Sequence, residues 1–331
     1  MPNALTHYYI SERIFDRLDD NTKRIVANYK KEYALGALGP DIIMGLMLDK
    51  EPLKRDAGEK LHNEFVYAGL FAAAEYLYRN NDDYAMYAYF LGFLTHYAAD
   101  TTVHPYVYYY TENLKNKYDP KLINCLHTIV ETEMDVYVAN HLMQGKKANS
   151  FHRFKGGRKR RKLVSKFFLE INKDIFGLIL TEKDIKRSMF FFKLMMLICQ
   201  RQKNGRLRFF FVKQVDRYIK AEHLLLSALR PLALDNRYDY LNMQKKPYKA
   251  IYHEENCDMV NHTFPEMLEL AAERGVELIA VASKHIFNGE PMSLEQFKLN
   301  YNGGFNDEYL NAGLGVPNGA CDMPQGQVNG S

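Results

Sequence analysis

The sequence contains few of the residues and patterns that define several protein classes. Its 331 residues include only four cysteines, which lie far apart at Cys125, Cys199, Cys257 and Cys321. None of them has a partner at the close spacing that cysteine metal knuckles and disulfide frameworks use. We therefore expect reduced thiols in a cytosolic chain, and neither a disulfide scaffold nor a cysteine-based metal site.

Targeting and membrane-spanning segments are also missing from the sequence. The N-terminal stretch MPNALTHYYISERIF has no basic region, no continuous apolar region and no small-residue cleavage site, so we expect no signal peptide. The longest apolar run, MFFFKLMMLIC, is interrupted by Lys193 and is too short to span a bilayer. With 47% hydrophobic residues, 25% charged residues and a net charge of +4, the composition suits a soluble cytoplasmic protein.

Strand-like alternation is scarce, whereas helical periodicity is present almost throughout. The segments NEFVYAGLFAAAEYLYRN and DYAMYAYFLGFLTHYAADTTV are apolar on most of their circumference, which predicts helices in the centre of the fold. Pro105 disfavours a helical conformation at His104, so we expect the second helix to end there. The predicted fold class is all-α, a bundle of many helices.

Changes in composition divide the chain into four parts. Residues 1–145 form a first helical domain, and residues 146–166, which include FHRFKGGRKRRKLVSK, are expected to be a basic loop or boundary. Residues 167–300 supply further helices that pack on the first part. Residues 301–331 are rich in Gly, Asn and Pro, and we expect a poorly ordered tail.

Polar groups that are costly to bury lie in the apolar segment LGFLTHYAADTTVHPYV. His96, Asp100 and His104 follow one another at intervals of four residues, so a helix turning ~100° per residue places them on one face. The stretch HTIVETEMD repeats the pattern with His127 and Glu131. Converging imidazoles and carboxylates are costly to bury unless a charged group joins them. A divalent metal does so, and His with Asp or Glu suits zinc.

Each of these residues also has a simpler interpretation. A single histidine on an apolar helix is more often a core residue with one hydrogen bond than a metal ligand, although two helices that both carry a His-x-x-x-acid pattern favour a metal. Asp41 follows Gly39 and Pro40, where a carboxylate can project from a loop. His62 lies just before the next helix in KLHNEF. Taken alone, Asp41 and His62 would be surface loop residues.

The ordered motifs THYYI, LGALGPD, LHN, LGFLTHYAADTTVHP and HTIVETEMD resemble the zinc-dependent phospholipase C family. The wider superfamily includes the S1/P1-type nucleases. The resemblance covers residues 4–142. It implies that residues 1–145 are a helical domain of this kind, with two to three zinc ions between helices of the N-terminal half. It also implies an enzyme, a zinc-dependent hydrolase of phosphodiester bonds, for which we expect a phospholipid substrate.

Position by position, the resemblance implies eight zinc ligands. Asp41, His62, His96 and Asp100 match the ligands of one zinc, His7 and Asp100 those of a second, and His104, His127 and Glu131 those of the remaining zinc. Asp100 is thus expected to bridge two ions. Asp135, one turn beyond Glu131, matches no ligand, and it is expected either to orient a ligand or to be exposed.

Two features depart from the secreted phospholipases C and the S1/P1-type nucleases. Those enzymes begin with a Trp whose amino and carbonyl groups bind zinc, whereas this sequence has no Trp and retains Met1 ahead of His7. The zinc shared by His7 and Asp100 is therefore expected to have an incomplete set of protein ligands. The short DTTVH spacing resembles the branch of glycosylphosphatidylinositol-specific phospholipase D, which leaves C-type and D-type cleavage both open.

The expected reaction is attack of a zinc-bound hydroxide on the phosphorus, because zinc lowers the pKa of bound water to ~7 and neutralises phosphoryl oxygens. Asp41 is the catalytic candidate that orients or deprotonates this water, besides being a ligand. The alternatives are a nuclease or small-phosphoester hydrolase of the same superfamily, and a non-catalytic protein with a structural zinc cluster. Structural sites are usually closed and often rich in cysteine, so the His/Asp/Glu set favours a catalytic site.

The basic run RKRRK at residues 158–162 is the clearest charge cluster. A solvated loop is its simplest interpretation. If it is functional, it suits peripheral contact with an anionic membrane or with a nucleic acid about equally. The sequence leaves the head group of the substrate, the oligomeric state and the role of residues 166–290 open.

Overall fold

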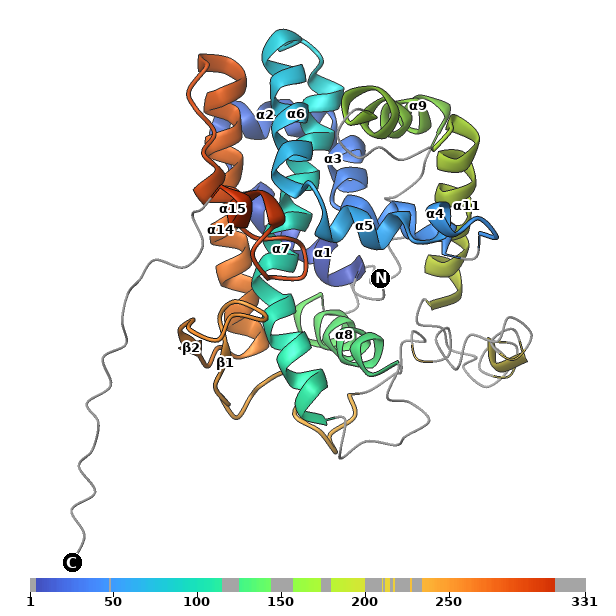
Figure 1. Ribbon diagram of the computed structural model, residues 1–331, viewed down its shortest axis with the longest axis vertical. Coiled ribbons are helices and arrows are strands. Elements are labelled where there is room, and N and C mark those ends of the chain that lie inside the picture. The colour runs from blue at the N-terminus through green and yellow to red at the C-terminus, as the bar shows by residue number, and fades with distance from the viewer. Residues whose placement is uncertain are drawn as a thin grey trace, which may run out of the picture.

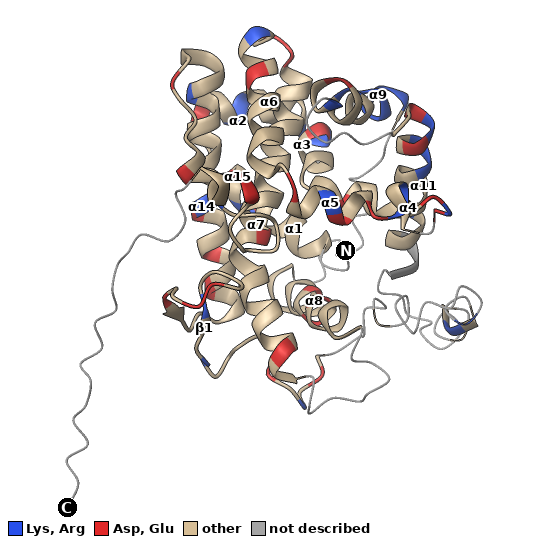
Figure 2. Ribbon diagram, in the orientation of Figure 1, with Lys and Arg blue, Asp and Glu red and all other residues tan. Residues whose placement is uncertain are grey.

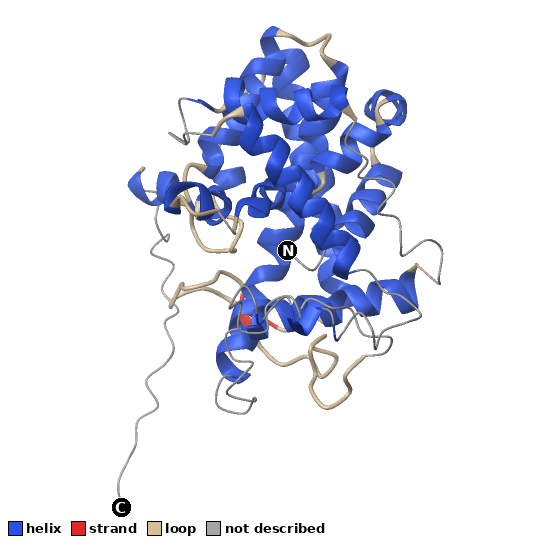
Figure 3. Ribbon diagram, turned by 90° about the vertical axis from the view of Figure 1, so that its right-hand side faces the viewer, coloured by secondary structure: helices blue, strands red, loops and turns tan. Residues whose placement is uncertain are grey.

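The computed structural model describes residues 4–47, 49–114, 125–143, 157–173, 180–199 and 234–312, together with 210, 212–214, 217 and 227. Within these residues the chain is almost entirely helical, which confirms the all-α prediction (Figure 3). Strands β1 (Tyr248–Lys249) and β2 (Met259–Val260) form one short antiparallel pair. None of the described helices is long and apolar enough to cross a membrane.

Successive short helices make up the first part of the chain. They are α1 (Ala4–Arg17), α2 (Asp20–Asn28), α3 (Lys30–Gly36), the 3₁₀ helix η1 (Gly39–Leu46), α4 (Pro52–Arg55), α5 (Ala57–Asn63) and α6 (Val66–Arg79). Longer helices follow: α7 (Tyr84–Leu114), α8 (Leu126–Tyr137) with the π turn η3 (Val138–Leu142), α9 (Arg158–Lys166) with the π turn η5 (Phe167–Ile171), and α11 (Glu182–Cys199). The C-terminal part contains α14 (Phe264–Asn288), η6 (Leu294–Phe297) and α15 (Asp307–Asn311).

Helix α7 is the axis of the fold, and α1, α3, α8 and α14 pack around it (Figure 1). Helix α3 lies against α7 at two glycines. A Cβ on Gly36 would come within 1.9 Å of the carbonyl oxygen of Tyr89, and a Cβ on Gly92 within 2.0 Å of that of Tyr33. Only glycine permits this approach, which fixes the loop after α3 next to the middle of α7.

Helix α7 continues through Pro105 to Leu114, so the predicted end near His104 is wrong. An internal proline removes one helical hydrogen bond and costs about 3 kcal/mol. Beyond it, however, Tyr106, Val107 and Leu114 are buried. Burying such side chains stabilises by about 1.5–3 kcal/mol each, which outweighs the local preference of the proline.

Two segments that the composition assigned to loops are folded. Residues 158–166 form helix α9, because Arg and Lys are good helix formers and Val164 is buried against the core. The rest of the expected basic boundary, up to residue 156, lies outside the described residues. Residues 301–312 of the expected tail contain α15 and the buried side chains of Tyr301 and Tyr309, whereas residues 313–331 lie outside the described part of the chain.

Candidate metal centre

The centre is built on the middle of α7, where His96, Asp100 and His104 lie on one face as their spacing predicts. All three side chains are buried, with 0%, 3% and 7% of their residue surface exposed. Most neighbouring positions of α7 are apolar and buried as well, so the three polar groups lie within the core of the fold. They must be satisfied by groups from neighbouring elements.

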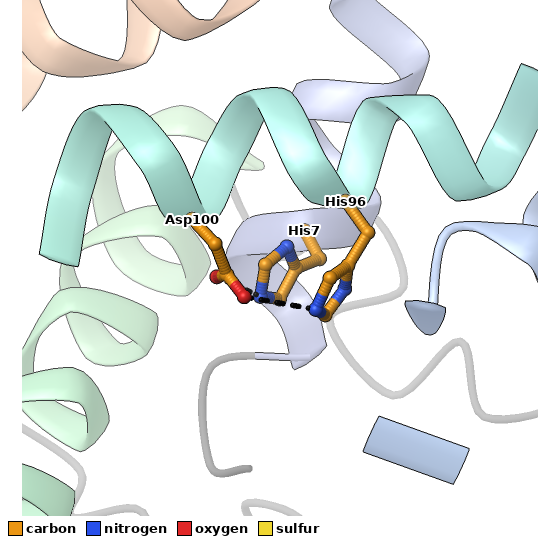
Figure 4. Close-up of side chains that lie close together, drawn as sticks. All are labelled: His7, His96 and Asp100. Carbon is orange, nitrogen blue, oxygen red and sulfur yellow. Dashed lines mark ion pairs between the residues drawn. The ribbon is translucent and has the colours of Figure 1, made fainter. Parts of the chain in front are cut away.

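Helix α1 supplies the first of these groups, His7 (Figure 4). The Nε2 atom of His7 lies 3.2 Å from Oδ1 of Asp100, and Nε2 of His96 lies 3.0 Å from Oδ2 of the same carboxylate. The two imidazole rings stack with centroids 3.9 Å apart. Asp100 therefore directs each of its oxygens to a different imidazole, as a residue that bridges two ions would.

Asp41 and His62 lie on the other side of His96. Gly39, with a φ of 52°, and Pro40 start η1 and place Asp41 in its first turn. Helix α5 brings His62 to it, with Nε2 at 3.1 Å from Oδ1 of Asp41. The simple interpretation of these two as surface residues is wrong, because both are buried.

Helix α8 supplies His127 and Glu131, which are one turn apart. Oε1 of Glu131 lies 3.1 Å from Nε2 of His127 and 3.1 Å from Nε2 of His104 on α7. The side chain of His127 is 32% exposed, whereas that of Glu131 is 2% exposed. Among the eight predicted ligands, His127 thus marks the side from which solvent reaches the centre.

Backbone carbonyls orient three of the imidazoles. The Nδ1 atom of His62 lies 2.6 Å from the carbonyl oxygen of Gly58, and that of His96 lies 3.1 Å from the carbonyl oxygen of Ala37. The Nδ1 atom of His104 makes the same contact with Tyr301. When Nδ1–H donates to a carbonyl, the electron pair of Nε2 is free to bind a metal. This is the tautomer that a metal bound at Nε2 requires.

The C-terminal segment 299–305, which we call the Tyr301 strap, covers the centre at His62 and His104 and was missed by sequence reasoning. The carbonyl oxygen of Tyr301 accepts a hydrogen bond from Nδ1 of His104 at 2.5 Å. The backbone N–H of Tyr301 donates to the carbonyl oxygen of His62 at 3.0 Å. Gly303, with a φ of 79°, lies against the ring of Pro105. The Asn-Gly-Gly sequence at 302–304 marks a turn, but no pattern indicates what the turn contacts.

Asp135 is buried and contacts helix α1, which settles the choice between an orienting and an exposed residue. Its Oδ1 atom accepts from the N–H of Thr6 at 2.9 Å and from the hydroxyl of Thr6 at 2.8 Å, and its Oδ2 accepts from the N–H of Leu5 at 3.4 Å. A carboxylate at a helix N-terminus satisfies free N–H groups and interacts favourably with the helix dipole. Asp135 thereby holds the turn that carries His7.

We expect Asp135→Asn to lower the free energy of unfolding by about 2 kcal/mol, because the amide has one acceptor oxygen and no charge. Urea unfolding followed by circular dichroism measures this change. Asp82→Asn, at an exposed position, is the matched control and should leave stability unchanged. Equal stability of the two variants would contradict the anchoring of α1 by Asp135.

The electrostatics of the cluster favour a bound cation. Burial by itself would raise the pKa of Asp100 and of Glu131, but the neighbouring imidazoles hold both well below the usual range. Burial opposes protonation of His104, yet Asp100 and Glu131 raise its pKa to about 9. The carboxylates are therefore held in the ionised form. Despite burial, Asp100 also raises the pKa of His96. His96 and His104 thus carry the balancing protons when no metal is bound, whereas burial and the neighbouring His96 lower the pKa of His7. A divalent cation would replace these protons.

Within the described residues, three groups of side chains have ligand atoms within 4.8 Å of one another. They are His7 with His96 and Asp100, Asp41 with His62 and His96, and His104 with His127 and Glu131. All eight residues singled out from the sequence are members, and none of the three groups contains a cysteine. Buried nitrogen and carboxylate donors in this arrangement fit zinc.

Comparison with known families is consistent with this donor set. A family model described as zinc dependent phospholipase C matches residues 6–184, which is more than half of the chain. The match includes all eight candidate ligands and Asp135, and it ends before the Tyr301 strap. No curated protein and no solved structure matches the chain.

Proposed function

Because the chain belongs to the zinc-dependent phospholipase C family, we propose that it hydrolyses a phosphodiester bond of a phospholipid with the help of zinc held in this cluster. The observation that carries the proposal is the convergence of three buried His/carboxylate groups on a centre that is open at His127. A closed structural site would need no exposed edge, and structural zinc sites are often rich in cysteine.

The proposed ligands follow the three groups. Asp41, His62, His96 and Asp100 would hold one zinc, and Asp100 would also serve a zinc at His7. His104, His127 and Glu131 would hold a third. The distances from Asp100 to His7 and to His96 support the bridging role. Since His96 is a member of two groups, the chain can hold two or three ions, depending on which zinc His96 serves.

When bound, zinc ions supply Lewis acidity, which lowers the pKa of water and neutralises the oxygens of a phosphodiester. The residues of the chain supply position and a proton acceptor. Oδ1 of Asp41 faces His62, and its second oxygen is proposed to orient the attacking water and to accept its proton. The carbonyls of Ala37 and Tyr301 hold His96 and His104 in place, so that little reorganisation is required during the reaction.

The proposed function is tested by an activity screen of the zinc-loaded protein. The substrates are phosphatidylcholine, phosphatidylinositol, a simple soluble phosphodiester and single-stranded nucleic acid. We expect turnover of a phospholipid to exceed that of the other classes, and product analysis distinguishes a phosphorylated head group with diacylglycerol from phosphatidic acid. Activity on nucleic acid alone would replace the proposal with the nuclease alternative, and no activity on any substrate would favour a structural zinc cluster.

A further inference from the structure

Helix α11 has one face that packs on the metal-binding half of the fold and one that faces solvent. Ile185, Ser188 and Phe192 are buried on the inner face. The hydroxyl of Ser188 donates to the carbonyl of Ile42 in η1 at 2.6 Å. Since η1 also carries Asp41, α11 lies directly behind a proposed zinc ligand.

The outer face of α11 exposes large apolar side chains. Phe190 is 60% exposed, Phe191 37% and Leu194 41%. Leu194 follows Phe190 by four residues and Phe191 by three, so it lies one turn beyond both on the same side of the helix. Lys186 and Lys193 are exposed on either side of Phe190. Exposed aromatic and aliphatic residues between lysines are typical of helices that lie in a membrane interface.

A cleft of about 180 Å³ lies beside this face, between α11, α9 and the α3–η1 segment. Its apolar lining includes Leu35, Leu38, Ile42, Met189, Phe192 and Met196. Three cationic residues, Arg161, Lys186 and Lys193, also line it. Figure 2 shows Lys and Arg on both α9 and α11 around this region. Arg161 and Lys186 form no ion pair within the described residues, whereas Arg187 pairs with Asp49 and Asp184.

We propose that the outer face of α11, together with the adjoining cationic cleft, docks on the surface of a bilayer that contains anionic lipids. The cationic side chains are complementary to anionic head groups, and the apolar side chains can enter the acyl boundary. A single-stranded nucleic acid would need aromatic rings on which bases stack. The apolar lining of the cleft consists of five aliphatic or Met residues and two phenylalanines, Phe190 and Phe192, of which Phe192 is buried. Leu194 on the outer face is also aliphatic, so aliphatic surface predominates, which favours lipid.

Docking deepens the proposed function, and it rests on that function for its purpose, which is to hold the protein at the surface that carries a lipid substrate. The binding itself requires no hydrolysis. Attachment to vesicles and turnover of a soluble phosphodiester can therefore be measured separately on the same zinc-loaded protein.

The test is sedimentation with sucrose-loaded vesicles of phosphatidylcholine, with or without phosphatidylserine. We expect binding only when phosphatidylserine is present. Arg161→Gln combined with Lys186→Gln should weaken binding on the order of thirtyfold, since each cation near an anionic surface contributes about 1 kcal/mol. Phe190→Ser combined with Leu194→Ser should weaken it on the order of tenfold through lost apolar burial.

The matched control combines Leu270→Ser and Lys284→Gln, which are exposed positions on α14. It should bind vesicles like the wild type, and all variants should retain the wild-type thermal midpoint and soluble-substrate turnover. Wild-type protein that hydrolyses phosphodiesters but ignores anionic vesicles would overturn the docking proposal alone. Vesicle binding without hydrolysis of any substrate would contradict the proposed function but not the docking proposal. The docking proposal would also be overturned if the control variant lost as much vesicle binding as the test variants. Binding of nucleic acid, and not of vesicles, through the same residues would overturn it as well.

Discussion

Replacing Asp100 with asparagine is expected to lower the rate of phosphodiester hydrolysis by at least about a thousandfold while most of the helix content remains. The two oxygens of Asp100 face His7 and His96 at 3.2 and 3.0 Å. An amide presents one oxygen and one NH₂ group, and the NH₂ group cannot bind a cation. The substitution should therefore break the proposed bridge with almost no change in side-chain volume. Turnover of a soluble phosphodiester and far-UV circular dichroism measure the two quantities.

Glu133→Gln is the matched control for this variant. Glu133 is a buried carboxylate on α8 that accepts from the N–H of Asp235 and is a member of none of the three ligand groups. Its replacement should leave turnover close to wild type, although it removes a buried charge. If Asp100→Asn keeps wild-type activity, Asp100 is not the bridge, and the proposed ligand assignment fails at its centre.

Removing all zinc with a strong chelator is expected to abolish hydrolysis and to lower the free energy of unfolding by roughly 4 kcal/mol for a metal present at a thousand times its dissociation constant. Without metal, the buried carboxylates depend on protons carried by His96 and His104 for neutralisation. Thermal unfolding before and after chelation, with zinc measured by mass spectrometry, checks both effects. A protein that retains less than half an equivalent of zinc after dialysis, with the same stability, would contradict the zinc centre.

The zinc at His7 is expected to leave first as chelator is added. Its other two ligand candidates are shared, because His96 is also grouped with Asp41 and His62, and Asp100 is proposed to serve the same neighbouring ion. His7→Ala should remove this first step of the titration and spare the later release of zinc. A single transition for all zinc, or an unchanged titration in His7→Ala, would mean that the site is absent or is completed by other ligands.

The sequence predicted the parts of the site that depend on helical spacing. His96, Asp100 and His104 share a face because a helix has 3.6 residues per turn, and the same rule placed His127 beside Glu131. The prediction that these two helices share a site with His7, Asp41 and His62 came from the family resemblance. Spacing within one helix says nothing about which other helix packs against it.

The contacts that could not be predicted are those between segments far apart in the chain. Asp135 was recognised as being in line with Glu131, but its hydrogen bonds to Thr6 depend on how α8 meets the start of α1. The glycines and asparagine of residues 302–304 were part of the predicted poorly ordered tail, because composition does not reveal that Tyr301 is buried between His62 and His96. The helix end predicted at His104 was wrong for a related reason. The local conformational preference imposed by Pro105 is overcome by burial of the residues that follow it in the core.

The Tyr301 strap has a consequence for how the protein is made. A ribosome delivers all eight candidate ligands by Glu131, yet the carbonyl that orients His104 comes from a residue 197 positions beyond that histidine. Domains tend to fold from the N-terminus during synthesis, and closing so long a loop is slow. The nascent chain therefore passes through a stage in which its eight candidate ligands are present but His104 lacks the carbonyl that orients its Nδ1 atom. The orientation of His104 is therefore completed only after residues 299–305 have been made and Gly303 has packed against Pro105.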